Sequence, residues 1–122
     1  MSLHNRSLGD EGESLAAEYL VRRGFKILER NFRCRVGEID IVARDDGTII
    51  FVEVKTRKNR LYGTPQLSVT PFKQRQISKA ALTWLAKKGQ LEVSARFDVI
   101  SITFVGQEPR IEHIPNAFDL AY

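Results

Sequence analysis

The chain has 122 residues, enough to bury a core and fold as one domain without stabilising cross-links. Its composition, 43% hydrophobic and 28% charged, excludes the disordered and fibrous classes. Lys and Arg number 19 against 15 Asp and Glu, so the net charge is +4, and this sign favours a polyanionic partner.

The first half of the chain predicts one helix followed by three strands. Apolar residues recur at helical spacing over residues 7–23, and Gly24 supplies a C-terminal stop. Runs of β-branched and aromatic residues predict strands at 25–32, 36–44 and 48–56. The turn Asp45-Asp46-Gly47 between the last two predicts a hairpin, and the polar, basic stretch 57–69 is typical of a loop.

The second half predicts one more helix and two strands. Thr70 and Pro71 suit the N-cap and the first position of a helix that ends at Gly89. Strands are expected at 95–104 and 110–114. The order α-β-β-β-α-β-β predicts the α/β class: a single domain, 1–122, in which helices flank a mixed β-sheet.

Cysteine usage and hydropathy limit the cellular setting. Cys34 is the single cysteine, which excludes an internal disulfide and a thiolate zinc cluster. No apolar stretch approaches the length of a membrane span, and no secretory signal is recognisable at the N-terminus. We therefore expect a cytoplasmic protein with no membrane partner.

Two of the predicted strands carry charged residues in register. Alternation places Glu53 and Lys55 on one face of their strand, and Glu38 and Asp40 on one face of the strand before it. If the hairpin closes through a two- or four-residue loop, Asp40 lies opposite Glu53 and Glu38 opposite Lys55. A three-residue loop would shift this register. The two simplest even-numbered turns therefore bring two acidic side chains together.

Opposed carboxylates, with Cβ atoms about 5 Å apart, destabilise a sheet unless something compensates. Three compensations are open: protonation of one acid, the neighbouring ammonium group of Lys55, or a divalent cation held between the carboxylates. With no His or Cys nearby in sequence, that cation would be Mg²⁺ or Mn²⁺ rather than zinc. The alternative interpretation is an ordinary ion pair on a solvent-facing strand.

An acidic residue on an early helix, an Asp on one strand and Glu-x-Lys on its hairpin partner resemble the PD-(D/E)xK nuclease superfamily. Glu13, Asp40, Glu53 and Lys55 occupy these positions, with Ile39 rather than proline before the Asp. More closely, the stretches "GESLAAEYL", "GEIDIVARD", "FVEVKTR" and "RFDVI" resemble the uncharacterised bacterial YraN-type family of predicted endonucleases, which are similar to archaeal Holliday junction resolvases. The likeness covers nearly the whole chain and implies a restriction-endonuclease-like fold.

This resemblance implies a metal site with a water-activating group. Asp40 and Glu53 would ligate Mg²⁺ together with the backbone carbonyl of Val54, and Lys55 would orient or deprotonate the attacking water. Glu13 would be an outer or second-metal ligand. The equally open alternative for Glu13 is an exposed helix acid.

Other polar residues would support this centre. Basic residues in the loop after the Glu-x-Lys strand and on one face of the second helix are candidates for phosphate contacts. They are Arg57, Lys58, Arg60, Lys73, Arg75 and Lys79. By resemblance Gln76 would face the site, and Glu38 would hold Lys55 in place if the derived register is right. His113 has no second metal ligand at suitable spacing, which indicates a hydrogen-bonded strand histidine.

These features predict a Mg²⁺-dependent endonuclease that hydrolyses phosphodiester bonds in DNA, with branched or structured DNA as the substrate that the resemblance implies. Two alternatives stay open: a non-catalytic nucleic-acid-binding module of the same fold, and an RNA-directed nuclease. A homodimer is expected if the junction analogy holds, because two symmetric cuts need two active sites.

Overall fold

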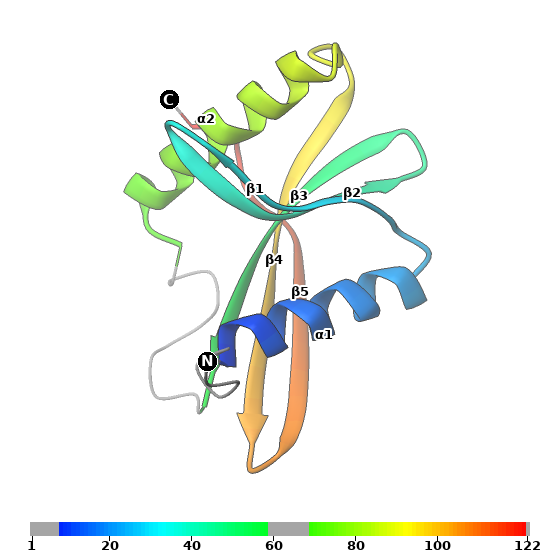
Figure 1. The fold of residues 1–122 in the computed structure, drawn as a ribbon, viewed down its shortest axis with the longest axis vertical. Coiled ribbons are helices and arrows are strands. Elements are labelled where there is room, and N and C mark those ends of the chain that lie inside the picture. The colour runs from blue at the N-terminus through cyan, green and yellow to red at the C-terminus, as the bar shows by residue number, and fades with distance from the viewer. Residues whose placement is uncertain (1–7, 59–68, 122) are drawn as a thin grey trace, which may run out of the picture.

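The computed structural model describes residues 8–58 and 69–121, which form one mixed sheet with a helix on each face (Figure 1). In chain order the elements are α1 (Leu8–Arg22), β1 (Lys26–Cys34), β2 (Gly37–Asp45), β3 (Thr48–Arg57), α2 (Pro71–Lys87), β4 (Ser94–Val105) and β5 (Glu108–Phe118). The strands follow the order β1-β2-β3-β4-β5, with β3 and β4 parallel and the other neighbours antiparallel. The predicted fold class and element order are thereby confirmed.

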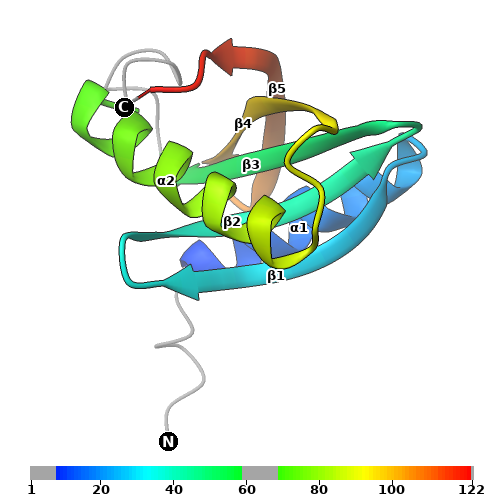
Figure 2. The same cartoon turned by 90° about the horizontal axis from the view of Figure 1, so that it is seen from above.

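The two helices cover opposite faces of the sheet, as Figure 2 shows. α2 packs Ile77 and Trp84 into one core with Phe51 of β3. α1 packs Leu20 into a second core that includes Val52, the next residue of β3. β3 is therefore buried on both faces, and any charge that it carries must be paired or neutralised. Neither helix in the described part of the chain is long and apolar enough to cross a membrane.

α2 begins and ends where the sequence predicts. The Thr70 side chain accepts a hydrogen bond from the Lys73 amide at 3.2 Å, and Pro71 occupies the first turn, where its missing N–H costs nothing. After the helix, Gly89 takes the left-handed conformation with φ 66°. These caps fix where α2 starts relative to the sheet, which matters because Lys73 lies in its first turn.

The β2–β3 hairpin has the predicted register. Asp45 pairs with Thr48 across the turn, and the ladder continues to Ile41 opposite Val52. Asp46 in the turn has φ 53°, a left-handed conformation that Asp tolerates better than most residues. The next positions beyond the ladder are Asp40 and Glu53, so the turn chemistry alone brings the two acids to the same level.

Side-chain alternation in β2 breaks at Asp40, so Ile39 and Ile41 do not share the face that regular alternation would give them. Ile39 belongs to the core under α2, whereas Ile41 belongs to the core under α1. Opposite Asp40 on β1, Asn31 has a left-handed backbone with φ 55°. At this break in the alternation, the Asp40 carboxylate accepts a hydrogen bond from the backbone N–H of Val54 in β3.

β5 is longer than predicted. Strand structure covers Glu108–Phe118 rather than residues 110–114 alone, although the segment contains Pro109 and Pro115. β5 lies at the edge of the sheet and pairs only with β4 in the described structure. An edge strand has N–H groups that need no ladder partner, so prolines do not end it.

Candidate active site

The two acids lie where β2 separates from β3. Backbone pairing between these strands stops at Ile41 and Val52, whereas β3 stays paired with β4 as far as Arg57. The start of β2 packs on α2 instead: a Cβ atom on Gly37 would lie only 2.8 Å from the carbonyl oxygen of Gln76. The first residues of β2 and the last residues of β3 therefore diverge, at the left of Figure 1.

Asp40 and Glu53 meet where the two strands separate. The backbone N–H of Val54 donates to Oδ2 of Asp40 at 2.8 Å, and the Asp40 carboxyl group also shares a hydrogen bond with that of Glu53. Glu53 is 6% exposed. Burial and, next, the negative charge of Glu53 raise the pKa of Asp40 to about 7, although the Val54 N–H acts in the opposite direction. The predicted opposition of the two acids is confirmed.

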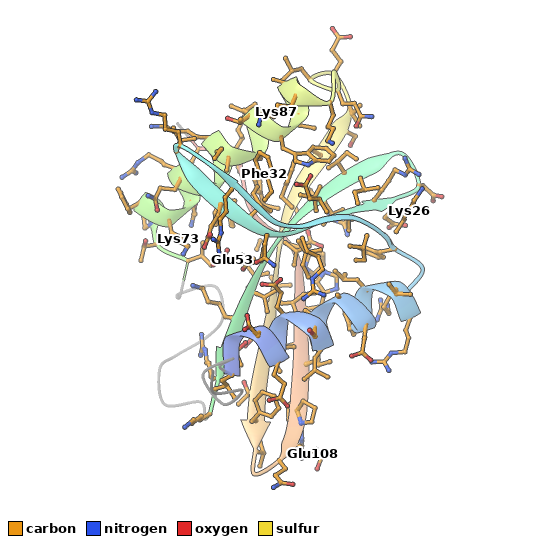
Figure 3. The ribbon with its side chains drawn as sticks, viewed as in Figure 1. Lys26, Phe32, Glu53, Lys73, Lys87 and Glu108 are labelled. Carbon is orange, nitrogen blue, oxygen red and sulfur yellow. The ribbon has the colours of Figure 1, made fainter. Side chains whose placement is uncertain are left out.

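Two lysines reach the same carboxylate oxygen. The Nζ atoms of Lys55 and Lys73 lie 3.1 and 3.7 Å from Oε2 of Glu53, respectively. Figure 3 shows Lys73, from α2, next to Glu53, from β3. The predicted common face of Glu53 and Lys55 is confirmed, and the Lys55 ammonium group is one of the compensations that the sequence leaves open. Glu53 is thus held by cations from two elements that are distant in the sequence.

Glu13 approaches the site from α1. A Cβ atom on Gly12 would collide with the Thr56 side chain, so glycine here lets α1 lie directly against the end of β3. The Glu13 carboxylate accepts hydrogen bonds from Asn31 Nδ2 at 2.9 Å and Arg30 Nη2 at 3.3 Å. Its side chain is only 12% exposed, and its charge contributes to the raised pKa of Asp40. Glu13 is therefore not a solvent-exposed helix acid.

These residues fit a hard divalent cation. Within the described residues no group of three or more His, Cys, Asp or Glu side chains is arranged to hold a metal ion. Mg²⁺ is usually bound by one or two carboxylates, with waters and substrate phosphates completing its octahedron. Asp40 and Glu53 supply two carboxylates whose mutual repulsion a cation would relieve. Oxygen ligands without a nearby His or Cys also favour Mg²⁺ or Mn²⁺ over zinc.

The other predicted residues are placed unequally. Gln76 is half-buried and lies beside Lys73 in a surface groove at the start of β2.

Arg75 and Lys79 are exposed on α2, and Lys58 is exposed at the far end of β3, in a hollow beside the N-terminus of α1. Arg57 is half-buried at the end of β3. The predicted basic residues therefore do not gather into one patch. Arg60 lies outside the described residues.

Glu38 does not support Lys55, which corrects that prediction. Its Oε2 atom lies 3.2 Å from Nε of Arg33, and Lys55 pairs with Glu53 instead. Counted from the hairpin turn, the predicted register ends at the Ile41–Val52 pair. The first residues of β2, which include Glu38, lie against α2 instead of β3. The prediction failed because it assumed two straight strands.

Sequence reasoning also misplaced Lys73 by assigning it to the outer, basic face of α2. Helical spacing contains the signal that could have located it: Lys73, Ile77, Ala80 and Trp84 follow the i, i+4, i+7, i+11 pattern of one face. The last three are buried against the sheet. Lys73 continues their row beyond the edge of the core, where its ammonium group meets the buried Glu53.

A mixed sheet with a helix on each face and an acid pair between two diverging strands defines an α/β protein with a candidate cation site. The chain belongs to the uncharacterised protein family UPF0102, whose model matches residues 12–102. It is 76% identical over 122 residues to a UPF0102 protein of Geobacter metallireducens, with all of both chains covered. Identity to a UPF0102 protein of Geobacter sulfurreducens is 66% over 122 residues, covering 99% of this chain and 95% of the relative. For a UPF0102 protein of Syntrophus aciditrophicus it is 52% over 118 residues, covering 97% and 93%. The resemblance to the YraN-type family is confirmed.

Proposed function

We propose that this protein is a Mg²⁺-dependent endonuclease that hydrolyses phosphodiester bonds in DNA. The observation that carries the proposal is the contact between Asp40 and Glu53, two largely buried carboxyl groups brought together where β2 separates from β3, with the pKa of Asp40 raised to about 7. Such a pair costs stability unless it is used. Perturbed carboxyl groups of this kind are concentrated at functional sites.

Mg²⁺ bound to Asp40 and Glu53 would polarise the scissile phosphate and lower the pKa of a bound water. The backbone carbonyl of Val54 is the further ligand that the resemblance implies. The N–H of the same residue already orients Asp40 by its 2.8 Å hydrogen bond. The chain itself therefore supplies two anionic ligands, one of which is held in place by the backbone of the strand that carries the other.

The surrounding side chains suit phosphate chemistry. Lys55 and Lys73 place two ammonium groups at Glu53, where they would offset the charge that develops on a phosphate in the transition state. Lys55 is also the group that would orient the attacking water. Glu13 contributes negative charge near Asp40 from α1 while Asn31 and Arg30 hold its carboxylate. It would act as an outer ligand.

Branched DNA is the proposed substrate class, on the strength of the resemblance to junction resolvases. The basic net charge of +4 supports a polyanionic partner in general. A homodimer would supply the two active sites that symmetric cutting of a junction needs.

The deciding experiment is a cleavage assay on end-labelled single-stranded, duplex, flapped and four-way-junction DNA, and on matched RNA, with Mg²⁺, Mn²⁺ or EDTA. We expect metal-dependent cleavage of at least one DNA substrate. Asp40→Asn and Glu53→Gln should each lower the rate by about 100-fold or more, because each removes an anionic ligand. Lys55→Ala should lower it by a similar factor.

Glu18→Gln is the matched control, because Glu18 is an exposed acid on α1, more than one helical turn beyond Glu13. It should cleave like the wild type. Cleavage that persists unchanged in Asp40→Asn would refute the proposed site. Tight DNA binding without any metal-dependent cleavage would indicate a binding module, and cleavage confined to RNA would replace the substrate class.

A further inference from the structure

A second feature adjoins the acid pair. A groove of about 370 Å³ runs between the turn that joins β1 to β2 and the first half of α2. Its walls include Arg33 at the end of β1, Arg35 in the turn, Glu38 at the start of β2, and Lys73 and Gln76 from α2. Arg33 and Arg35 were not among the residues that the sequence singled out.

The groove lies beside a close contact between the β1–β2 connection and the helix. Gly37 lies so close to the Gln76 carbonyl oxygen that a Cβ atom would come within 2.8 Å of it. Cys34 closes the turn with a hydrogen bond from Sγ to the Gly37 carbonyl oxygen at 3.4 Å. The backbone on both sides of Arg35 is therefore held in place, by the Cys34 hydrogen bond and by the contact of Gly37 with α2.

Charge in the groove is predominantly positive. Three cations, Arg33, Arg35 and Lys73, face one acid, Glu38. The Arg33–Glu38 ion pair is largely exposed, with 76% and 56% of the two side chains accessible. An exposed pair of this kind contributes little stability, so Arg33 can exchange Glu38 for a phosphate at small cost. Arginine also binds phosphate oxygens with two parallel hydrogen bonds.

Lys73 connects the groove to the acid pair. It lines the groove, and its Nζ atom lies 3.7 Å from Oε2 of Glu53. A phosphodiester chain with one phosphate at Asp40 and Glu53 would therefore continue past Lys73 toward Arg35 and Arg33. Among the described residues, the hollow beside Lys58 is lined by one acid, Glu11, and by neither Asp40 nor Glu53.

We propose that this groove binds the sugar-phosphate backbone of the nucleic-acid strand next to the phosphate that is cut. This inference rests on the proposed nuclease function and extends it by naming the surface that holds the strand. In this proposal Arg33 and Arg35 contact backbone phosphates. Lys73 lies between the groove and the acid pair, and Gln76 lines the groove on the α2 side. Contacts of this type position a strand without reading its sequence.

The test measures binding separately from cleavage. Fluorescence anisotropy with a labelled junction and a labelled single strand, in Ca²⁺ or EDTA to suppress cleavage, is recorded for the double variant Arg33→Gln/Arg35→Gln over a range of salt concentrations. Binding should weaken by about 10-fold, and the slope of log K against log salt should decrease by about 1.5 to 2 because two phosphate contacts are lost. Glu38→Gln should change binding in the opposite direction, by about 2-fold, because Glu38 is the one acid among the described residues that line the groove.

Arg110→Gln is the matched control. Arg110 is likewise an exposed arginine beside a hairpin turn and pairs with Glu108 at 3.9 Å, but it lies on the β4–β5 side of the sheet. It should leave affinity and slope nearly unchanged. An equal loss in Arg110→Gln, or an unchanged salt slope in the double variant, would overturn the groove while leaving cleavage by the wild type intact. Reduced binding in the double variant, with no cleavage by the wild type in Mg²⁺, would instead support the groove and refute the nuclease.

Discussion

Asp40 on β2 and Asp98 on β4 lie on the two strands that flank β3, and their carboxylates have opposite kinds of partner. Asp98 is completely buried. Arg96 donates to it twice, at 3.0 and 3.2 Å, and Nε2 of His113 lies 2.7 Å from its Oδ2. Asp40 accepts one backbone hydrogen bond and otherwise faces another acid.

The outcome is a pair of opposite pKa shifts. Burial by itself raises the pKa of Asp98, but hydrogen bonds from His113 and Arg96, and then from the Asn116 N–H, lower it overall. Burial likewise raises the pKa of Asp40, and Glu53 adds to the increase. Burial of an acid is therefore not by itself a sign of function. What distinguishes the candidate site is that the side chain facing the buried Asp40 is a second acid, Glu53.

A bulge in β5 explains how Asp98 acquires its partners. Phe97 pairs with Phe118 whereas Val99 pairs with Ile114, so β5 has extra residues opposite Asp98. Asn116 in this bulge has φ 50°, and its N–H donates to Asp98 at 2.9 Å. The carboxylate therefore satisfies backbone that the ladder leaves unpaired, which is a structural role.

His113 extends the Asp98 network to α1. Its Nδ1 atom lies 3.1 Å from the Tyr19 hydroxyl group, and the two rings pack edge to face. The prediction of a hydrogen-bonded strand histidine is confirmed. The network ties the edge of the sheet to the helix that carries Glu13, so it contributes to the site only by holding the fold.

The largest expected effect comes from breaking the satisfied carboxylate. Asp98→Asn removes the charge that compensates Arg96 and His113, and the free energy of unfolding should fall by about 3 kcal/mol. Denaturant titration followed by circular dichroism measures the change. Asp119→Asn, at an exposed position, is the control and should change stability by no more than about 0.5 kcal/mol. A loss below that value in Asp98→Asn would show that the network does not stabilise the fold.

A smaller effect of the opposite sign is expected from the unsatisfied carboxylate. At pH 8 without metal, Asp40→Asn should increase the free energy of unfolding by about 1 to 2 kcal/mol, because it removes the repulsion with Glu53 and keeps an acceptor for the Val54 N–H. Added Mg²⁺ should raise the melting temperature of the wild type and not that of this variant. A destabilised Asp40→Asn would mean that Asp40, like Asp98, is structural.

The smallest effect is the pH dependence that separates the two acids. In the unfolded chain Asp40 loses its proton near its ordinary pKa of 3.8, but the folded protein keeps the proton until its raised pKa of about 7. Without metal, the wild type should therefore lose stability relative to Asp40→Asn as the pH rises from about 4 to 7, and the difference should level off above pH 7. Asp98, with its lowered pKa, gives stability that is present above the ordinary value and is lost as the pH falls below it. Denaturant titrations of both proteins at half-unit pH intervals measure the difference, and a difference that shrinks as the pH rises would contradict the assignment.

Much of the candidate site could be predicted because it depends on one tight turn. The Asp46-Gly47 turn sets the register of the β2–β3 hairpin, and the register sets Asp40 against Glu53. Strand alternation then places Lys55 beside Glu53. These relations span only a few residues along the chain, so local backbone rules suffice to derive them.

The Asp98 network could not be predicted in the same way. It requires a bulge in β5 at Asn116 and a tyrosine on α1, and it joins residues up to 94 positions apart. No period in the sequence encodes a bulge, because the extra residues are selected by what packs against them in the folded sheet. At that point the sequence predicts a strand, and "RFDVI" contributes to the family resemblance, but neither indicates which groups pair with Asp98.

By itself the sequence determined the element order, the caps of α2 and the meeting of Asp40 with Glu53, because each follows from local periodicity, turn chemistry or strand register. Only the tertiary structure decided that Lys73 reaches Glu53, that Glu38 pairs with Arg33, and that a basic groove adjoins the acids. Those contacts depend on where β2 leaves β3 to pack on α2. That divergence arises from packing between elements that are distant in the chain, and local sequence rules contain no information about it.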